Sequence, residues 1–137
     1  LVLSTWHNNP VHNPPDPVFE TVATVFDPGT KYATMRIPAL VCSKKGTLLA
    51  FCEARTAMGD YAEMDLVMRR STDGGRTWGE TMVIAPREAK RPTSNCTPIV
   101  DADGRTIHLL YQRGYSNCYY IRSVDDFFND TATTEIT

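Results

Sequence analysis

A short polar pattern occurs twice in this chain, each time directly after a group of short, strand-like segments. The first copy is Ser71-Thr72-Asp73-Gly74, and the second, Ser123-Val124-Asp125-Asp126, begins 52 residues later. No stretch of the chain has a sustained helical period. A repeat of this length with about four short strands per unit is typical of the blades of a β-propeller. We therefore predict an all-β fold, a partial propeller with about one complete blade and three strands of a second.

The predicted strands are short runs of alternating or β-branched apolar residues, separated by turn-forming residues. They cover residues 18–26, 35–42, 47–53, 63–70, 81–85, 95–100, 106–112 and 118–123. Residues 1–17 are rich in proline, asparagine and histidine and have no hydrophobic period, so we interpret them as a linker or leader. His7 and His12 lie in this segment and are not interpreted as a metal pair.

The second and third predicted strands form a hairpin that gathers charged side chains at one edge. Its turn ends at Gly46, which is free to adopt a positive φ. Because the first strand begins and the second ends at the same edge of an antiparallel pair, Arg36 is expected close to Glu53 and Arg55. The loop that follows carries Asp60. Two guanidinium groups and a carboxylic acid converge there, and we predict the active site at this edge.

Charge and length exclude several classes of protein. The chain has 137 residues and a net charge of -2, which gives no electrostatic footprint for nucleic acid or an anionic membrane. No apolar run is long enough to span a bilayer. The four cysteines lack metal-ligand spacing, and tight-turn pairing sets Cys42 opposite residue 47 or 48 rather than Cys52. We interpret the cysteines as buried free thiols and expect no metal and no cofactor.

Three motifs together resemble the sialidase (neuraminidase) family. They are the RIP motif at residues 36–38, the EAR triplet at residues 53–55 followed by Asp60, and the SxDxGxTW box at residues 71–78. The family folds as a six-bladed β-propeller, and the box is its Asp-box, which other propellers also use. The resemblance covers about residues 18–126 and implies that they form the first blades of such a propeller.

The resemblance implies substrate-binding roles for four residues at the predicted edge. Arg36 is similar to the first of three arginines that bind the carboxylate of sialic acid, for which a planar, bidentate guanidinium is suited. Arg55 resembles an arginine that lines the same pocket, the alternative being a salt-bridged surface residue. Glu53 is expected to orient Arg36 across the hairpin end. Asn95 resembles a family residue near the acid/base end of the pocket.

Asp60 matches the catalytic acid/base aspartate of the family. A general acid protonates the leaving glycosidic oxygen, so it needs a raised pKa and a position near the pocket mouth. Glu63 and Asp65 are rivals, although Asp65 lies inside a predicted strand that runs away from the edge. Arg113 and Tyr115 belong to a loop of the second blade that faces the site, and we expect them to be solvated loop residues.

The Asp-box itself is expected to be structural, because the third strand of the blade delivers it to the edge opposite the site. Asp73 is expected to accept backbone N–H bonds of its own turn, and Trp78 to pack between blades. The residues with expected structural roles are Ser71, Asp73, Gly75, Thr77 and Trp78.

Two observations concern the extent of the chain. The family nucleophile is a tyrosine assisted by a glutamate, and the resemblance implies that this pair and two further arginines belong to later blades. The chain alone is therefore expected to be inactive. After Asp126 the second box pattern breaks, and residues 127–137 contain the run NDTATTEI, which resembles a translated sequencing adapter. We interpret residues 127–137 as a non-native tail.

The resemblance implies the N-terminal fragment of a retaining exo-α-sialidase that acts on sialylated glycans, with a secreted or periplasmic location favoured. A non-catalytic Asp-box propeller that binds sugars or proteins is the alternative, and it would need the box but not the acid pocket. A truncated product without a function of its own is a third possibility.

Overall fold

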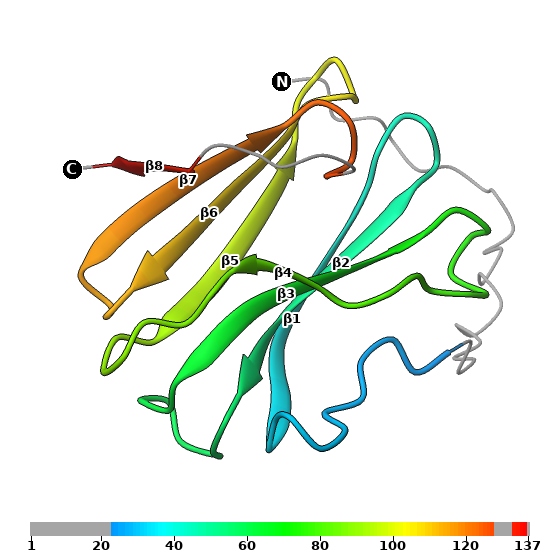
Figure 1. Cartoon of the computed structure of the whole chain (residues 1–137). Coiled ribbons are helices and arrows are strands. Elements are labelled where there is room, and N and C mark those ends of the chain that lie inside the picture. The colour runs from blue at the N-terminus through cyan, green and yellow to red at the C-terminus, as the bar shows by residue number, and fades with distance from the viewer. Residues whose placement is uncertain (1–22, 128–132, 137) are drawn as a thin grey trace, which may run out of the picture.

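The computed structural model describes residues 23–127 and 133–136, which form two four-stranded antiparallel sheets (Figure 1). Within each sheet, every strand pairs with the strands that precede and follow it in the sequence. No helix occurs within the described ranges, so the prediction of an all-β fold is confirmed. The first sheet contains β1 (Thr34–Cys42), β2 (Leu48–Arg55), β3 (Met64–Ser71) and β4 (Met82–Ala85). The second contains β5 (Thr93–Val100), β6 (Ile107–Arg113), β7 (Asn117–Ser123) and β8 (Thr133–Ile136).

The main hydrophobic core is built from side chains of both sheets. Alternate residues of β2 and β3 face alternate residues of β6, as the two-residue period of a strand requires. Phe51 meets Phe127 edge to face, with ring centroids 5.9 Å apart. Complete burial of one large apolar side chain stabilises a fold by about 1.5–3 kcal/mol. The core contains Leu49, Phe51, Leu66, Met68, Ile107, Leu109, Tyr111, Ile121 and Phe127, each at most 2% exposed.

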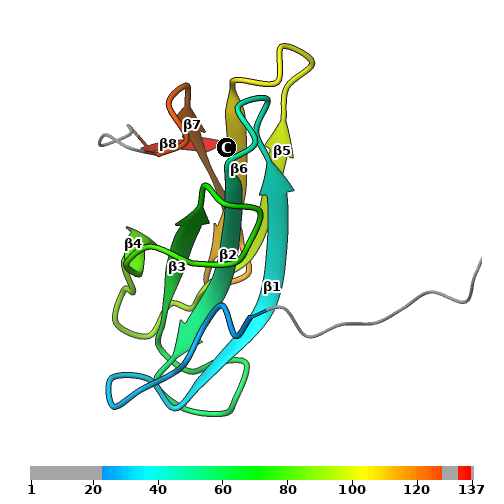
Figure 2. The ribbon, with the colours of Figure 1, turned by 90° about the vertical axis from the view of Figure 1, so that its right-hand side faces the viewer.

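The first strands of the two sheets, β1 and β5, lie side by side and share an irregularity (Figure 2). Each has a register shift near its start, and Ile37 (φ 54°) and Asn95 (φ 56°) occupy these shifts with left-handed backbone. Pro38 and Pro98 fit because both strands are sheet edges, where a missing N–H costs no ladder bond. Bulges of this kind re-aim side chains, and here both lie at the same end of the sheets.

A smaller apolar cluster covers the other face of the first sheet. It includes Tyr32, Cys52 and Val67, with Phe26 packed against it. The predicted strand over residues 18–26 lies partly outside the described residues, and its described part is not a strand. The prediction is wrong there because the Arg69 guanidinium, rather than a neighbouring strand, bonds the Val25 carbonyl at 2.6 Å.

The second sheet has four strands where the sequence predicted three. The additional strand, β8, pairs antiparallel with β7 from Thr133 opposite Ile121 to Ile136 opposite Cys118. The edge of β7 offers unpaired N–H and C=O groups, and a segment rich in β-branched residues is suited to pair with it. The interpretation of residues 127–137 as a non-native tail stays a prediction.

The Asp-box turn after β3 is held by the side chains of Ser71 and Asp73. The Ser71 hydroxyl donates to Asp73 Oδ1 at 2.8 Å and accepts the Gly75 N–H at 2.9 Å. Asp73 accepts the Thr77 hydroxyl at 2.6 Å and the Thr77 N–H at 2.9 Å. These bonds favour the ionised carboxylate and hold the pKa of Asp73 far below its ordinary value. The Trp78 indole donates to the Gly75 carbonyl at 3.1 Å, while its packing between blades stays a prediction.

The turn after β7 repeats this arrangement without the glycines. The Ser123 hydroxyl donates to Asp125 Oδ1 at 2.9 Å and accepts the Phe127 N–H at 2.8 Å. Asp126 (φ 58°) and Phe127 (φ 60°) adopt the left-handed backbone that the two glycines adopt in the first turn. The sequence repeat therefore corresponds to a repeat of hydrogen bonds.

The two sheets are also joined at the end opposite the two bulges. The Lys44 N–H donates to the Gly104 carbonyl at 2.6 Å, where a Cβ on Gly104 would lie 2.8 Å from the Lys44 Cβ. The Ser43 hydroxyl donates to Asp126 Oδ2 at 3.2 Å, and Lys45 lies 3.9 Å from the same oxygen. The Asp126 carboxylate is thus a buried link between the β1–β2 turn and the second sheet.

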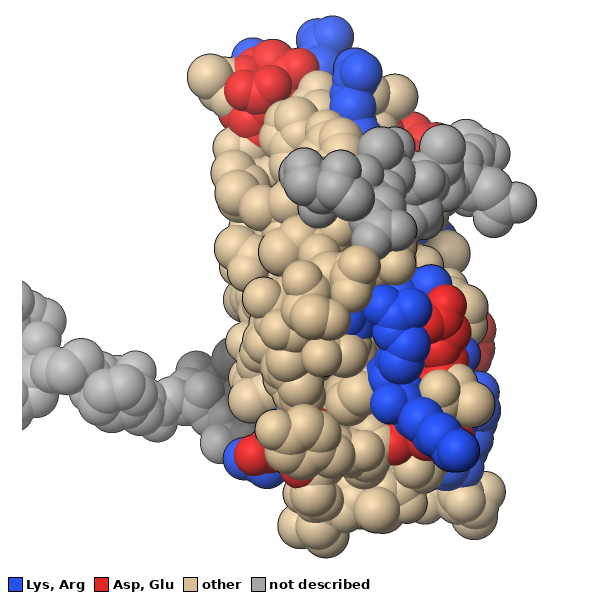
Figure 3. Space-filling model, turned by 90° about the vertical axis from the view of Figure 1, so that its left-hand side faces the viewer, with Lys and Arg blue, Asp and Glu red and all other residues tan. Residues whose placement is uncertain are grey.

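Part of the surface is apolar or uncharged. Leu40 on β1 is 60% exposed and Ile99 on β5 is 47% exposed. On the side of the molecule seen in Figure 3, charged side chains gather toward the edges and a wide area carries none. Within the described residues, no helix is long and apolar enough to cross a membrane.

Replacing Asp73 by asparagine tests the Asp-box turn. We expect a lower Tm at neutral pH because the charge that accepts these bonds is removed. Because the pKa of Asp73 is lower in the folded state, its carboxylate contributes its full stabilisation at pH values above the unfolded-state pKa of about 3.9. This stabilisation is lost as the pH falls through the folded-state pKa. The Tm difference should therefore narrow in acid, as followed by circular dichroism. Glu80→Gln, at an exposed position nearby, is the control, and an Asp73→Asn deficit that is constant with pH would contradict the argument.

Candidate active site

A pocket of about 430 Å³ opens at the end of the sheets where β1 begins and β2 ends. The first sheet contributes β1, β2 and the loop after β2, while the second contributes β5 and the β6–β7 loop. The hairpin argument predicted this edge, and four of the five predicted site residues, all but Glu53, line the pocket. The lining residues are Arg36, Ile37, Arg55, Asp60, Tyr61, Asn95 and Tyr115.

Glu53 is the buried centre of the hydrogen bonds beneath the pocket. Its side chain is fully buried, and its Oε2 atom accepts from Arg55 Nε at 2.9 Å and from Arg55 Nη2 at 2.5 Å. Its other oxygen accepts the Asn95 N–H, from the second sheet, at 2.9 Å. One carboxylate therefore fixes a residue of each blade. The positive φ of Asn95 directs its backbone N–H toward Glu53 while its side-chain amide bonds Gln112 at 2.8 Å.

The expectation that Glu53 orients Arg36 is wrong. Glu53 lies opposite Arg36 in the strand register, but its side chain bonds Arg55 and Asn95 instead. Because Glu53 is fully buried and does not line the pocket, it supports the site from below. The physical reason is competition: Arg55 is also buried, and a buried guanidinium needs a close carboxylate more than an exposed one does.

Arg36 has a different environment from Arg55. Its side chain is 45% exposed, and in the described part of the chain its side-chain hydrogen bond is to Asp60, with Nη1 and Oδ1 3.3 Å apart. Arg55 is 3% exposed, and all three of its nitrogens are engaged by Glu53, Asp60 and the Gly59 carbonyl. Arg36 therefore has donors directed at the open pocket, whereas four of the five N–H donors of Arg55 are engaged.

Asp60 lies at the mouth of the pocket and accepts from both arginines. Arg55 Nη1 lies 2.7 Å from Asp60 Oδ1, and the side chain of Asp60 is 67% exposed. The hydrogen bond and charge of Arg55, with a smaller contribution from Arg36, hold the pKa of Asp60 below its ordinary value. The raised pKa that a general acid requires is thus not present in the free pocket. Asp60 is therefore ionised at neutral pH.

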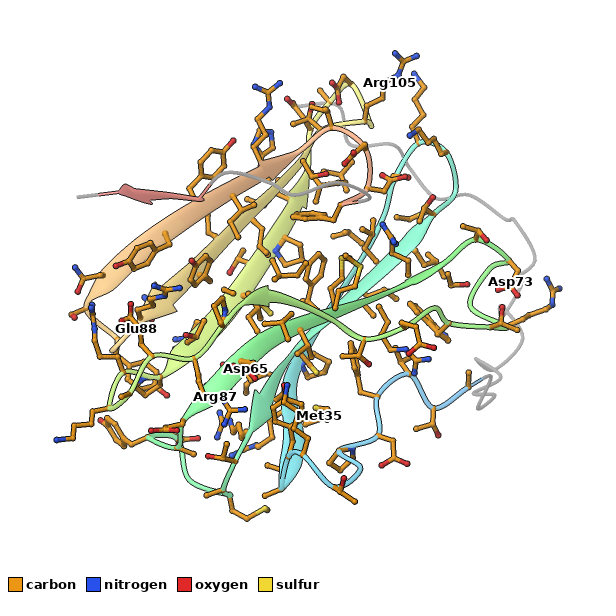
Figure 4. The ribbon with its side chains drawn as sticks, viewed as in Figure 1. Met35, Asp65, Asp73, Arg87, Glu88 and Arg105 are labelled. Carbon is orange, nitrogen blue, oxygen red and sulfur yellow. The ribbon has the colours of Figure 1, made fainter. Side chains whose placement is uncertain are left out.

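The two rival acids do not reach the pocket. Asp65 is buried and is not among the lining residues; Figure 4 shows it beside Arg87. Burial would raise the pKa of Asp65, but hydrogen bonds from Tyr32 (2.6 Å) and Arg87 (2.7 and 3.0 Å) outweigh it and hold the pKa below its ordinary value. Glu63 is exposed and is not among the lining residues.

Arg113 and Tyr115, at the β6–β7 loop, make more side-chain contacts than the sequence indicated. Arg113 is paired with Glu88 at 2.8 Å and lies over the ring of Tyr119, so it is not a solvated loop residue. Tyr115 lines the pocket, and its hydroxyl donates to the Asp60 carbonyl oxygen at 2.5 Å. The expectation of a solvated position is wrong for Arg113, whose side chain is 17% exposed. Tyr115 is exposed, as expected, but it also contacts the first blade, because strand alternation cannot predict how far a side chain reaches across a blade boundary.

Curated sialidases are similar to this chain in sequence. The sialidase of Micromonospora viridifaciens is 37% identical over 89 residues, a match that covers 60% of this chain and 14% of that protein. Sialidase-4 of Mus musculus is 39% identical over 83 residues, covering 57% of this chain and 17% of that protein. A sialidase of Bacteroides fragilis is 44% identical over 48 residues, or 34% of this chain and 9% of that protein. No family model matches the chain.

Solved structures of sialidases share the fold. Hadza microbial sialidase Hz136 matches 77% of this chain with a TM-score of 0.66 and 20% identity, over 26% of its own length. A mutant of Trypanosoma rangeli sialidase displaying trans-sialidase activity matches 77% of this chain with a TM-score of 0.57 and 20% identity, over 19% of its own length.

This chain is a relative of the sialidases. The two sheets are two blades of a partial β-propeller, as the sequence repeat predicted. The chain spans 9% to 17% of the length of the curated relatives above.

Two lining residues of this sialidase relative were not singled out from the sequence. Tyr61 directly follows Asp60 and meets Tyr115 edge to face, with ring centroids 5.5 Å apart. Ile37 lines the pocket from the β1 bulge. An aromatic residue adjacent to the candidate acid was the available signal for Tyr61, whereas the backbone of Ile37 follows from a bulge that no sequence pattern marks.

The cysteines of this sialidase relative are free, as predicted, but only two are buried. Burial raises the pKa of Cys52 to about 12 and that of Cys96 to about 11, so both remain thiols at neutral pH. Cys42 and Cys118 are exposed, contrary to the prediction. The described residues contain no cluster of three or more His, Cys, Asp or Glu side chains suited to a metal ion.

Truncation of Glu53 tests its role beneath the pocket. Glu53→Ala leaves the buried Arg55 guanidinium without its carboxylate, and such a loss typically costs about 3–5 kcal/mol. We expect the free energy of unfolding, measured by denaturant titration, to fall by that order. Glu63→Ala removes an exposed carboxylate ten residues along and should change stability little. Equal effects of the two substitutions would contradict the assignment.

Proposed function

We propose that this chain is the first part of the catalytic propeller of a retaining exo-α-sialidase, which removes terminal sialic acid from glycoconjugates. The observation that carries the proposal is the pairing of an exposed arginine, Arg36, with a carboxylic acid, Asp60, across one open pocket. Sialic acid is a sugar with a carboxylate beside its glycosidic bond, so its hydrolysis requires both a cation and an acid within one site.

Arg36 is proposed to bind the substrate carboxylate. A guanidinium offers two parallel charge-assisted hydrogen bonds, which match the two oxygens of a carboxylate. The partial exposure of Arg36 and its single 3.3 Å contact with Asp60 support this role. Arg55, four of whose five N–H donors are engaged, is proposed to position Asp60 rather than to contact the carboxylate.

Asp60 is proposed to be the general acid and base. Substrate binding is proposed to raise its pKa, which favours the protonated acid. When the substrate carboxylate pairs with Arg36, one of the two positive charges that stabilise ionised Asp60 is neutralised. The pKa of Asp60 then rises by the part that Arg36 contributes, while the larger contribution of Arg55 remains, so a proton on Asp60 becomes less costly. That proton passes to the leaving glycosidic oxygen as the bond to the anomeric carbon breaks. Asp60 later takes a proton from the water that completes the reaction.

The nucleophile is proposed to come from elsewhere in the propeller. The family resemblance assigns that role to a tyrosine with a glutamate partner on later blades, together with two further arginines. We therefore expect the 137-residue chain alone to be inactive.

The alternative function is that of a non-catalytic Asp-box propeller that binds sugars or proteins. Such a module needs the box turns but has no use for an acid held by two arginines at a pocket mouth. The contacts among Arg36, Arg55 and Asp60 favour the enzyme.

Substitution of Arg36 tests carboxylate recognition. In the full-length protein that contains this segment, Arg36→Lys should raise KM sharply because a bidentate pair becomes a point contact. The loss of a charge-assisted bond costs on the order of 1.5–3 kcal/mol. Steady-state kinetics on a sialoside measures the change. Unchanged KM and kcat would make Arg36 a structural residue.

The proton transfer by Asp60 is tested by changing the leaving group. General acid catalysis contributes about 10²–10⁴-fold in rate, so Asp60→Ala should strongly slow the cleavage of natural glycans. An aryl sialoside leaves with little protonation and should lose less. Single-turnover glycosylation of both substrates measures the two effects.

Asp73→Ala is the control for Asp60→Ala, since a box turn at the far end of the sheet should affect stability and leave kcat almost unchanged. Equal losses on both substrates for Asp60→Ala would remove Asp60 from the catalytic role and direct attention to Glu63.

A further inference from the structure

The loop that carries Asp60 is closed at its base, where the Thr56 N–H and hydroxyl both bond the Glu63 carbonyl at 3.0 Å, and Arg55 Nη1 bonds the Gly59 carbonyl at 3.3 Å. Met58 is 69% exposed and Tyr61 is 83% exposed, so neither side chain anchors the loop in the core. Within the loop the Ala62 N–H bonds the Gly59 carbonyl at 3.2 Å. A general acid must nevertheless stay within hydrogen-bond reach of one oxygen of the substrate. These bonds hold the loop on either side of the Asp60 carbonyl, and a contact at that carbonyl would limit the motion of Asp60 further.

Tyr115 provides that contact from the other blade. Its hydroxyl donates to the backbone carbonyl of Asp60 at 2.5 Å, across 55 residues of sequence. Its ring meets Tyr61 edge to face, so it touches both residues of the loop that line the pocket. Arg55 holds the Asp60 carboxylate, and Tyr115 holds the Asp60 backbone.

The backbone of Tyr115 is unfavourable for its residue type. Gly114 and Tyr115 have consecutive left-handed conformations, with φ of 65° and 58°. Glycine or asparagine is preferred in such a turn, and a bulky aromatic residue there is strained. Strained residues of this kind cluster at functional sites, where a contact compensates for the strain. The contact that Tyr115 makes from this position is the one with the Asp60 loop.

The hydroxyl of Tyr115 is suited to donate. Burial, aided by the negative charge of Glu53, raises the pKa of Tyr115 above its ordinary value. The phenol therefore keeps its proton at neutral and mildly alkaline pH, and its bond to the Asp60 carbonyl persists over the whole range in which Asp60 titrates.

We propose that Tyr115 is a positioning residue, which fixes the Asp60 loop of the first blade from the second blade so that the acid stays aligned with the leaving oxygen. This inference rests on the proposed function, since it requires Asp60 to act as an acid. It adds a residue that acts through the backbone of Asp60, and it makes the geometry of the acid depend on the packing of two blades.

Tyr115→Phe in the full-length protein tests the proposal, because it removes only the hydroxyl and leaves the ring contact with Tyr61. One neutral hydrogen bond corresponds to a rate effect of about 3- to 10-fold, and we expect a loss of that size on a natural sialylated glycan. An aryl sialoside, which needs little protonation, should lose less. The matched control is Tyr120→Phe, which removes a hydroxyl bonded to His108 on the same blade, outside the pocket lining.

Two further measurements separate positioning from general stability. Hydrogen exchange of residues 56–62 should speed up in Tyr115→Phe while the Tm stays within a few degrees of wild type. In an Asp60→Ala background, Tyr115→Phe should cause no additional loss on the glycan, because there is no acid left to position.

The outcomes are distinguishable. If the wild-type protein cleaves neither substrate, the proposed function itself is overturned, and with it the role given to Tyr115. If the wild type is active but Tyr115→Phe has full activity, or loses equally on both substrates, only the role of Tyr115 is overturned. Unchanged exchange in residues 56–62 would likewise contradict it.

Discussion

The buried carboxylate of Glu53 is the interaction on which the candidate site depends. It has one oxygen for the Arg55 guanidinium and one for the backbone of Asn95, so a single side chain fixes the first blade and the second at the floor of the pocket. Without it, Arg55 would be a buried cation with an exposed partner only, and a buried charge is costly unless it is closely paired. Arg55 in turn holds Asp60, so the position of the exposed acid at the pocket mouth depends on the buried carboxylate of Glu53.

The electrostatics of the pocket suit an anionic ligand. Arg36 and Arg55 stabilise Asp60 as a carboxylate in the free pocket, and the cost of keeping two guanidiniums close together is thereby reduced. In the proposed function, a substrate carboxylate would replace Asp60 as the partner of Arg36. Binding would then remove part of the positive surroundings that keep Asp60 ionised.

Much of this arrangement was accessible from the sequence, and the limits have physical causes. Strand alternation and antiparallel geometry predicted the hairpin and the meeting of Arg36, Arg55 and Asp60, because both depend only on local periods and short turns. The partner of Glu53 was predicted wrongly, since the strand register brings Cα atoms together but burial decides which charges pair. Tyr115 is exposed, as expected, but its contact with the Asp60 loop was not predicted, because that contact depends on a left-handed backbone and on reach between blades. The fourth strand of the second sheet was missed because its segment was interpreted from its resemblance to an adapter.

The second box turn has a consequence for how such chains are compared. Ser123 reproduces the two bonds of the Ser71 hydroxyl, one to the aspartate two residues on and one from the N–H four residues on, although Asp126 and Phe127 replace the two glycines. These two bonds therefore form without glycine, which lowers the conformational cost of the left-handed backbone. A motif search that requires glycine would find one box in this chain, whereas the bonds of the serine hydroxyl occur twice in the described residues. Repeats in proteins of this type can therefore lose a recognisable sequence pattern while keeping the same local structure.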